Sequence, residues 1–260
     1  IINNSKIINS GFNNTNTTQQ CQVFFDINTS ILVNTSFESS VTNTSNQWWS
    51  EINIDRCVIK KFSSTLMGYQ VGNMTNSIII GHEIGNGINI LRGNFSNITV
   101  VNNNIGIIRE SDSQTFSVIN SNLFQNTSYN IKNNSTLNIL ATYNFWGVTD
   151  LSSIESLIYD YYDDINLGEV IVSNYQIIPN TNCPISPPLN LSSTQVMGGI
   201  NISWDPNIET DLAGYKLYYG NFDGFNFQHC INVGNVNSYF LSNFITTDTL
   251  IAITAYDSLA

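Results

Sequence analysis

The stretch Asn120-Ser-Asn-Leu123, preceded by the apolar residue Val118, decides the fold because variants of it recur along the chain. Related stretches occupy residues 9–12, 34–37, 55–58, 81–84, 102–105 and 141–144. Their last positions are 18 to 26 residues apart, with a mean of 22. A period in this range is typical of solenoids, in which each repeat forms one coil.

Short alternating apolar runs precede several of these stretches, among them Ile52 with Ile54 and Ile78 with Ile80. A period of two predicts strands, and strands at this interval with no helix between them predict stacked coils. Asn suits the corners because it tolerates left-handed backbone angles and its amide can bond to the next coil. A sandwich with strands about every 8–12 residues is the alternative, but it does not explain the recurring Asn. We therefore expect an all-β chain that begins with a right-handed parallel β-helix.

The repeat ends in Ala141-Thr-Tyr-Asn-Phe-Trp-Gly-Val-Thr-Asp150, which resembles the terminal signature of the right-handed β-helix repeat family. The resemblance covers residues 1–180 and implies a pectate-lyase-like solenoid that ends in a short capping helix and a strand. We expect the helix at residues 152–164 and the strand at 168–179. Asp150 or Ser152 can cap the helix. The apolar residues that would share one helical face are Ile154, Leu157, Ile158 and Tyr161.

Residues 181–188 concentrate three of the five prolines and predict a linker. Residues 189–260 resemble a fibronectin type III domain, with Trp204 as the core anchor after Gly199-Ile-Asn-Ile-Ser. The resemblance implies a β-sandwich with further strands at 211–219, 239–241 and 249–257. The last strand of that fold is missing, so we expect either further sequence or a partner to supply it.

Charge excludes several classes of partner. Only 10% of the 260 residues are charged, eight of them Lys or Arg, and the formal net charge is −11. Such a chain lacks the positively charged surface that would bind nucleic acid or anionic lipid. No apolar run of about 18 residues predicts a membrane span. We interpret the low content of basic residues as typical of an extracellular protein, secreted or attached to a cell surface.

One group of residues combines an acid, a base and a cation: Asp55, Arg56, His82 and Glu83. The repeat alignment places the first two beside the last two on successive coils, as a polysaccharide lyase or glycoside hydrolase could use them. The other interpretation is a surface ion pair with a His at a coil corner. No acid pair recurs at one coil position, and no nucleophile elbow or phosphate loop appears. Whether the chain is an enzyme stays open, and we favour a non-catalytic protein.

The remaining candidates concern binding and modification. Trp48 and Trp49 could stack on sugar rings or pack under a long loop. No metal-ligand pattern appears; calcium is conceivable only at Asp160, Asp163 and Asp164, which we expect on the solvated face of the capping helix. The four cysteines allow the pairs Cys21–Cys57 and Cys183–Cys230, or buried free thiols. Fourteen Asn-x-Ser/Thr sequons include Asn28, Asn34, Asn94, Asn97, Asn126 and Asn201.

Modular order and the scarcity of catalytic groups favour an extracellular protein whose solenoid is a spacer or a binding surface. Its expected partners are a carbohydrate, another cell-surface ligand, or neighbouring copies in a filament. A polysaccharide lyase or hydrolase is the alternative.

Overall fold

The structure is a computed structural model. It describes residues 2–3, 6–8, 11–14, 24–28, 31–33, 36–39, 51–60, 68–69, 71–81, 86–90, 92–110, 112, 114–222, 227–242 and 250–257. These residues form two compact units, Ile1–Pro184 and Ile185–Ala260, so the division falls within the Pro-rich segment. Each unit is described by itself.

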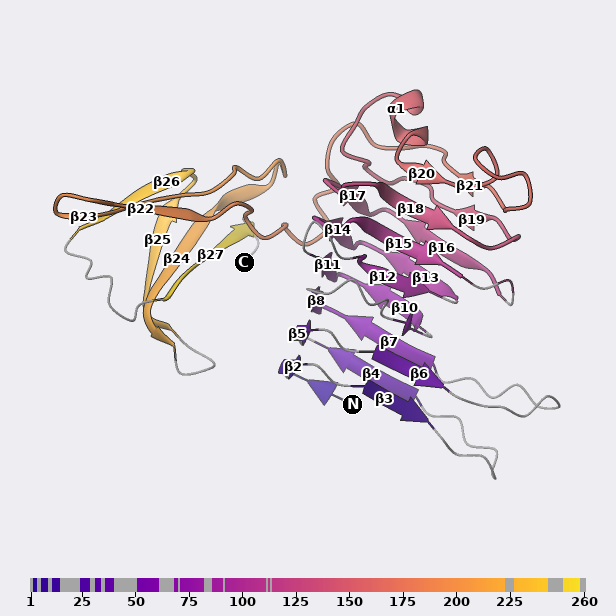
Figure 1. Cartoon of the computed structure of the whole chain (residues 1–260), viewed down its shortest axis with the longest axis horizontal. Helices are drawn as coiled ribbons and strands as arrows, with labels where there is room; N and C mark the ends of the chain where they lie inside the picture. The colour runs from indigo at the N-terminus through magenta and orange to yellow at the C-terminus, as the bar shows by residue number, and fades with distance from the viewer. Residues whose placement is uncertain are drawn as a thin grey trace. The chain divides into compact units, whose positions relative to one another are not determined.

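The first unit is a parallel β-helix of three sheets (Figure 1). Sheet A has the order β1 (Ile2–Asn3), β4 (Phe24–Asn28), β7 (Glu51–Asp55), β10 (Val71–Thr75), β13 (Gly93–Ser96), β16 (Phe116–Ile119), β19 (Ile139–Leu140) and β21 (Val170–Ile171). Sheet B has the order β17 (Asn122–Phe124), β14 (Thr99–Val101), β11 (Ile78–Ile80), β8 (Val58–Lys60), β5 (Ile31–Val33) and β2 (Lys6–Ile8). Sheet C has the order β20 (Ile158–Tyr159), β18 (Tyr129–Asn133), β15 (Ile105–Arg109), β12 (Ile88–Ile90), β9 (Gly68–Tyr69), β6 (Ser36–Ser39) and β3 (Gly11–Asn14).

From β1 to β19, successive strands enter sheets A, B and C in turn, and equivalent strands of neighbouring coils pair in parallel. The predicted solenoid is thereby confirmed. Apolar side chains stack inside it: in sheet A, for example, Ile54, Met74 and Phe95 are in register and at most 1% exposed. Because each coil adds inward side chains from each sheet, the core continues from coil to coil.

Two corners flank sheet B, and the repeat alignment confused them. The first corner joins sheet A to sheet B and holds Arg56, Asn76, Asn97, Asn120 and Tyr143, all with φ between 48° and 58°. The second follows sheet B and holds Asn102 and Gln125, with φ of 56° and 52°. Residues 55–58 and 120–123 belong to the first corner, whereas residues 102–105 follow β14 at the second. The irregular spacing of 18 to 26 residues arose because both corners are rich in Asn and entered one alignment.

The cap is shorter than predicted. The helix α1 spans only Leu151–Glu155, and Asp150 is its N-cap, accepting a hydrogen bond from the Ser153 backbone at 2.9 Å. Ile158 does not continue the helix: it pairs with Ile131 as part of β20, since β18 would otherwise leave its strand edge unpaired. The predicted strand at 168–179 reduces to β21 and a bridge between Phe145 and Gln176 that continues sheet B.

The second unit consists of two antiparallel sheets. Sheet D has the order β22 (Ser192–Val196), β23 (Gly199–Ser203) and β26 (Ser238–Ser242). Sheet E has the order β25 (Phe227–Gly234), β24 (Leu212–Phe222) and β27 (Leu250–Asp257). Both sheets contribute to one core in which the rings of Trp204 and Tyr215 lie 5.3 Å apart. The strands expected near 211–219, 239–241 and 249–257 are present. Strand β25 was not predicted.

Candidate functional site

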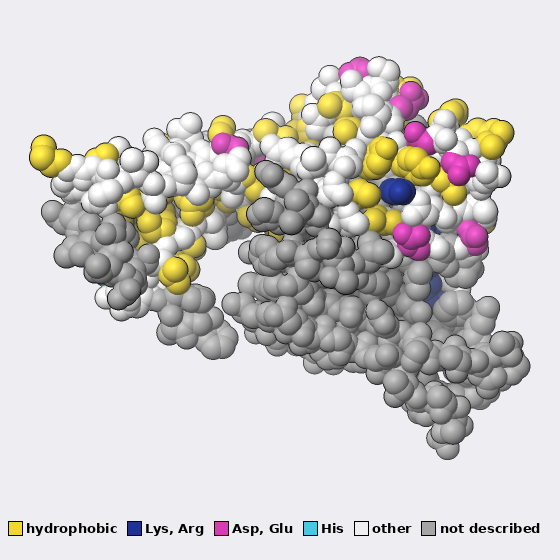
Figure 2. Space-filling model, in the orientation of Figure 1, with side chains coloured by type: hydrophobic (Ala, Val, Ile, Leu, Met, Phe, Trp, Pro, Cys, Tyr) yellow, Lys and Arg dark blue, Asp and Glu magenta, His cyan; other side chains and the backbone are white. Residues whose placement is uncertain are grey.

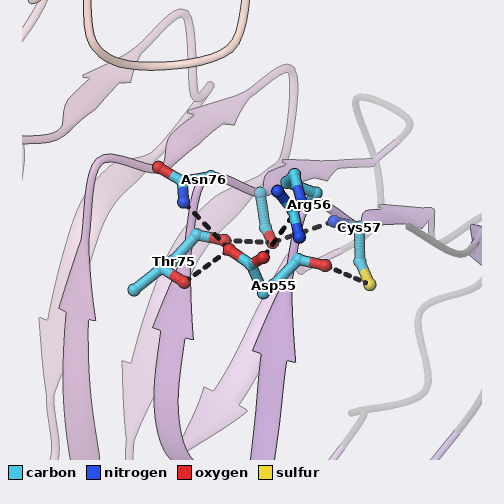
Figure 3. A network of polar contacts seen from close by, with 6 residues as sticks. Asp55, Arg56, Cys57, Thr75 and Asn76 are labelled. Atoms are coloured by element: carbon cyan, nitrogen blue, oxygen red, sulfur yellow. Dashed lines mark hydrogen bonds and ion pairs between the residues drawn. The ribbon is translucent and has the colours of Figure 1, made fainter. Parts of the chain in front are cut away.

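The corner around Asp55 contains the first half of the predicted catalytic group (Figure 3). The carboxylate of Asp55 accepts hydrogen bonds from Thr75 Oγ1 at 2.7 Å and Asn76 Nδ2 at 2.9 Å, both to Oδ1, and Arg56 Nε lies 3.0 Å from Oδ2. The Arg56 side chain is 67% exposed, so this ion pair is screened by solvent. Asp55 therefore fastens its own coil to the next one.

Strand register corrects the alignment on which that group rested. Asp55 is in register with Thr75, and the Arg56 backbone N–H donates to the Thr75 carbonyl at 3.2 Å. The residues that lie beside Asp55 and Arg56 on the next coil are thus Thr75 and Asn76. His82 and Glu83 come after β11 in the sequence and lie outside the described residues. Their proposed role remains an untested prediction.

Several other candidates also lie outside the part of the chain that the structure describes: Trp48, Trp49, Cys21 and Asn34, and the side chain of Asn28. Cys57 and Cys183 are buried, and their sulfurs lie 3.2 Å from the Asp55 carbonyl and 3.3 Å from the Asn120 carbonyl. Cys230 is exposed on β25. Both predicted disulfides therefore remain predictions.

The sequons differ sharply in accessibility. Asn94 and Asn201 are exposed, and Asn97 is partly exposed. Asn126 is only 7% exposed, and its amide nitrogen donates to the Val100 carbonyl and to Asn130 Oδ1. A glycan on Asn126 would replace one of the two amide hydrogens and so break one of these buried hydrogen bonds, and we expect this residue to be unmodified in the folded protein.

The acids proposed for calcium are not on a helix face. Asp160, Asp163 and Asp164 lie in turns after β20, and Asp160 is 4% exposed. The Asp160 carboxylate accepts backbone hydrogen bonds from Tyr162 at 3.0 Å and Val170 at 2.7 Å, so it holds the turn against β21. Among the described residues, no group of three or more His, Cys, Asp or Glu is placed to hold a metal ion, and no helix is long and apolar enough to cross a membrane.

Arg109, at the end of β15, is fully buried. Its guanidinium donates to the carbonyls of Leu137, Asn138 and Gln114, and so ties together loops of two coils. Burial lowers the pKa of Arg109, and the charge of Asp112 opposes this effect. The pKa of Asp112 is itself lowered, chiefly because the Thr136 backbone N–H donates to its carboxylate at 2.6 Å. We assign Arg109 a structural role.

The outer side of sheet C carries an aromatic group that the sequence did not reveal. The rings of Tyr129 and Tyr159 lie 5.8 Å apart, and Lys132 Nζ lies 4.8 Å from the centre of the Tyr159 ring. All three side chains are partly exposed. Figure 2 shows hydrophobic and acidic side chains around a dark blue basic side chain over β18 and β20. We call Tyr129, Lys132 and Tyr159 the tyrosine face.

Polar side chains flank the tyrosine face at both ends of β18. Before Tyr129, Ser128 Oγ donates to Asn104 Oδ1 at 2.6 Å, and Asn104 Nδ2 donates to Asn86 Oδ1 at 3.3 Å. Beyond Lys132, Asn134 Nδ2 donates to Glu110 Oε1 at 3.0 Å. Aromatic rings between amide, hydroxyl and carboxylate groups suit a ligand that has both apolar faces and many hydroxyls.

Sequence reasoning missed this face because Tyr159 belongs to a segment that was expected to be helical. The only available signal was the expectation that something must pair with the last strands of the solenoid. Comparison of the chain with protein families, with curated proteins and with solved structures found no match. What the tyrosine face binds is therefore inferred from its own geometry.

Proposed function

We propose that this chain is a non-catalytic, extracellular, modular protein whose solenoid binds a carbohydrate through the tyrosine face. The observation that carries the proposal is the aromatic pair Tyr129–Tyr159 between two rows of hydrogen-bonding groups. The C–H groups of a sugar ring pack against the negative face of an aromatic ring, and its hydroxyls both donate to and accept from amides. The low content of basic residues supports an extracellular location.

The hydrogen bonds of Asp55 favour binding over catalysis. A general acid or base must exchange its proton with a substrate. The Asp55 carboxylate instead accepts hydrogen bonds from Thr75 and Asn76 and forms an ion pair with Arg56, and all three residues belong to its own corner. A lyase or hydrolase remains the alternative that the experiment below distinguishes.

The finer fold assignments belong to the same proposal. We assign a right-handed coil to the solenoid and a fibronectin type III fold to the second unit. The strand orders β22-β23-β26 and β25-β24-β27 correspond to those of that sandwich without its last strand, which would lie beside β27. In this arrangement the second unit serves as a spacer.

Affinity electrophoresis in gels that each contain one soluble polysaccharide tests the function. We expect the full chain to be retarded by at least one neutral polysaccharide. Tyr159→Ala and Tyr129→Ala should each weaken binding about fivefold, because an aromatic contact contributes on the order of 1 kcal/mol. Tyr159→Phe should retain binding.

Tyr143→Ala is the matched control, since Tyr143 is 47% exposed at the first corner and does not belong to the tyrosine face. It should bind like the unaltered chain. Retardation by no polysaccharide, or equal losses in all three alanine variants, would contradict the proposal. Release of new reducing ends or unsaturated sugars by the unaltered chain would establish the enzyme instead.

A further inference from the structure

The last coil of the solenoid is only partly covered. Ile154 of α1 is fully buried over the core, but α1 has five residues. Beside it a cavity of about 470 Å³ remains between α1, the turn at Asp160 and β21. This volume lies within the roughly 300–1,000 Å³ that ligand sites occupy.

The floor of the cavity is apolar and belongs to the solenoid core. Ile158 and Val170 line it and are 5% and 4% exposed, and Val172 packs against the same core. Leu151 and Tyr162 stand at the rim and are 45% and 77% exposed. A partner that enters the cavity would cover these two side chains as well.

The remaining lining is acidic. Glu155, Asp163 and Glu169 line the cavity together with Asp160, and none of the lining residues is Lys, Arg or His. Asp160 is already bonded to the backbone N–H groups of Tyr162 and Val170, so it forms a wall of the cavity. Asp163 Oδ2 accepts a hydrogen bond from the Asp160 backbone N–H at 3.1 Å. Glu155 and Glu169 lie beside the apolar floor, and the described lining offers them no basic side chain.

We propose that this cavity receives a Lys or Arg side chain of a basic partner protein. An aliphatic stem fits against Ile158, Val170 and Val172, while the charged head reaches Glu155, Asp163 or Glu169. The partner differs from this chain, which carries a net charge of −11 and eight basic residues. A free amine would leave Leu151 and Tyr162 exposed, whereas a protein surface covers them. This site is independent of the tyrosine face.

The probe is a fluorescently labelled short peptide of alternating Lys and Leu, and its anisotropy is measured with the full chain at about 0.15 M salt, where the Debye length is about 8 Å. A peptide with norleucine in place of Lys is the uncharged control. We expect the Lys peptide to bind and the norleucine peptide to bind at least tenfold more weakly. The double variant Glu155→Gln, Glu169→Gln should weaken binding of the Lys peptide about tenfold.

Two further variants test whether binding requires this cavity or only the overall negative charge of the surface. Asp164→Asn removes a carboxylate that lies in the turns after β20 and does not line the cavity, and it should leave binding unchanged. Val172→Trp fills the cavity without altering charge, and it should abolish binding. The proposal would be overturned if the Lys peptide did not bind, or if both peptides bound equally. It would also be overturned if Asp164→Asn and the double Gln variant caused equal losses, or if a neutral oligosaccharide displaced the peptide. The double Gln variant should keep the polysaccharide binding of the tyrosine face, so the two proposals can fail separately.

Discussion

The two corners that flank sheet B are both rich in Asn, yet they are built differently. At the first corner the side chains of the left-handed residues vary: Arg56, Asn76 and Tyr143 are equivalent. At the second corner the amides of Asn103, Asn126 and Asn130 are at most 7% exposed and bond to one another and to backbone carbonyls.

The difference shows two uses of one residue type. At the first corner the backbone must turn, so any residue that tolerates a positive φ suffices, and Asn tolerates it well. At the second corner the amide satisfies buried donors and acceptors that no strand pairs with, so its side chain has a specific task. The left-handed positions of the first corner should therefore accept substitution, whereas the buried amides of the second corner should not.

The largest effect is expected for Asn126→Leu. Asn126 Oδ1 accepts from the Asn103 backbone at 3.0 Å and from Asn103 Nδ2 at 2.9 Å, and Asn126 Nδ2 donates to the Val100 carbonyl at 3.1 Å. The substitution leaves these buried groups without partners, which should lower the free energy of unfolding by about 3 kcal/mol or more. Urea unfolding of the unglycosylated protein measures the change.

Asn94→Ala is the matched control, because Asn94 is exposed on sheet A and accepts one hydrogen bond from Ser117. Its effect should stay within about 0.5 kcal/mol. Equal losses of unfolding free energy for the two variants would show that the burial of an asparagine does not determine how much its substitution destabilises the protein.

A smaller loss is expected for Ser77→Ala, just after the left-handed residue of the first corner. Ser77 is fully buried; its Oγ donates to the Thr75 carbonyl at 2.6 Å and accepts from the Cys57 backbone at 3.0 Å. Removing the hydroxyl leaves a buried N–H unpaired, at a cost of about 1–2 kcal/mol.

Hydrogen exchange of the Cys57 amide reports this change locally and should accelerate. Ser121 makes the equivalent contacts to Ile119 and Ile98, so Ser121→Ala should accelerate exchange at Ile98. An unchanged rate at both amides would contradict the assigned role of the hydroxyls.

The smallest effect has the opposite sign. Tyr143→Asn keeps the left-handed conformation (φ 58°) but replaces a residue that adopts it poorly. We expect an increase in unfolding free energy of about 0.5–1 kcal/mol, measured by urea unfolding. Arg56→Asn should gain less, because it also removes the ion pair with Asp55. Destabilisation by Tyr143→Asn would mean that the tyrosine side chain contributes packing.

Much of the fold could be predicted from the sequence, but the register could not. Alternation such as Ile78 and Ile80 identifies strands, and Trp204 identifies the core of the second unit. Two Asn-rich corners within one coil look alike in a linear sequence, because the pattern does not record which sheet a strand enters. The alignment paired Asp55 and Arg56 with His82 and Glu83, whereas the strand register places Thr75 and Asn76 beside them. The catalytic role of the four residues stays a prediction.

What the sequence determined by itself is local: the period of the coils, the all-β composition, the start of the cap helix at Asp150 or Ser152, and an acidic composition with few cations. Tertiary structure decided what depends on pairing between distant residues. Ile158 joined sheet C and did not extend a helix because β18 presented an unpaired edge. That pairing placed Tyr159 beside Tyr129, and the fold of the cap formed the cavity between α1, the turn at Asp160 and β21. Both candidate sites arise at the end of the solenoid, where no next coil dictates the packing.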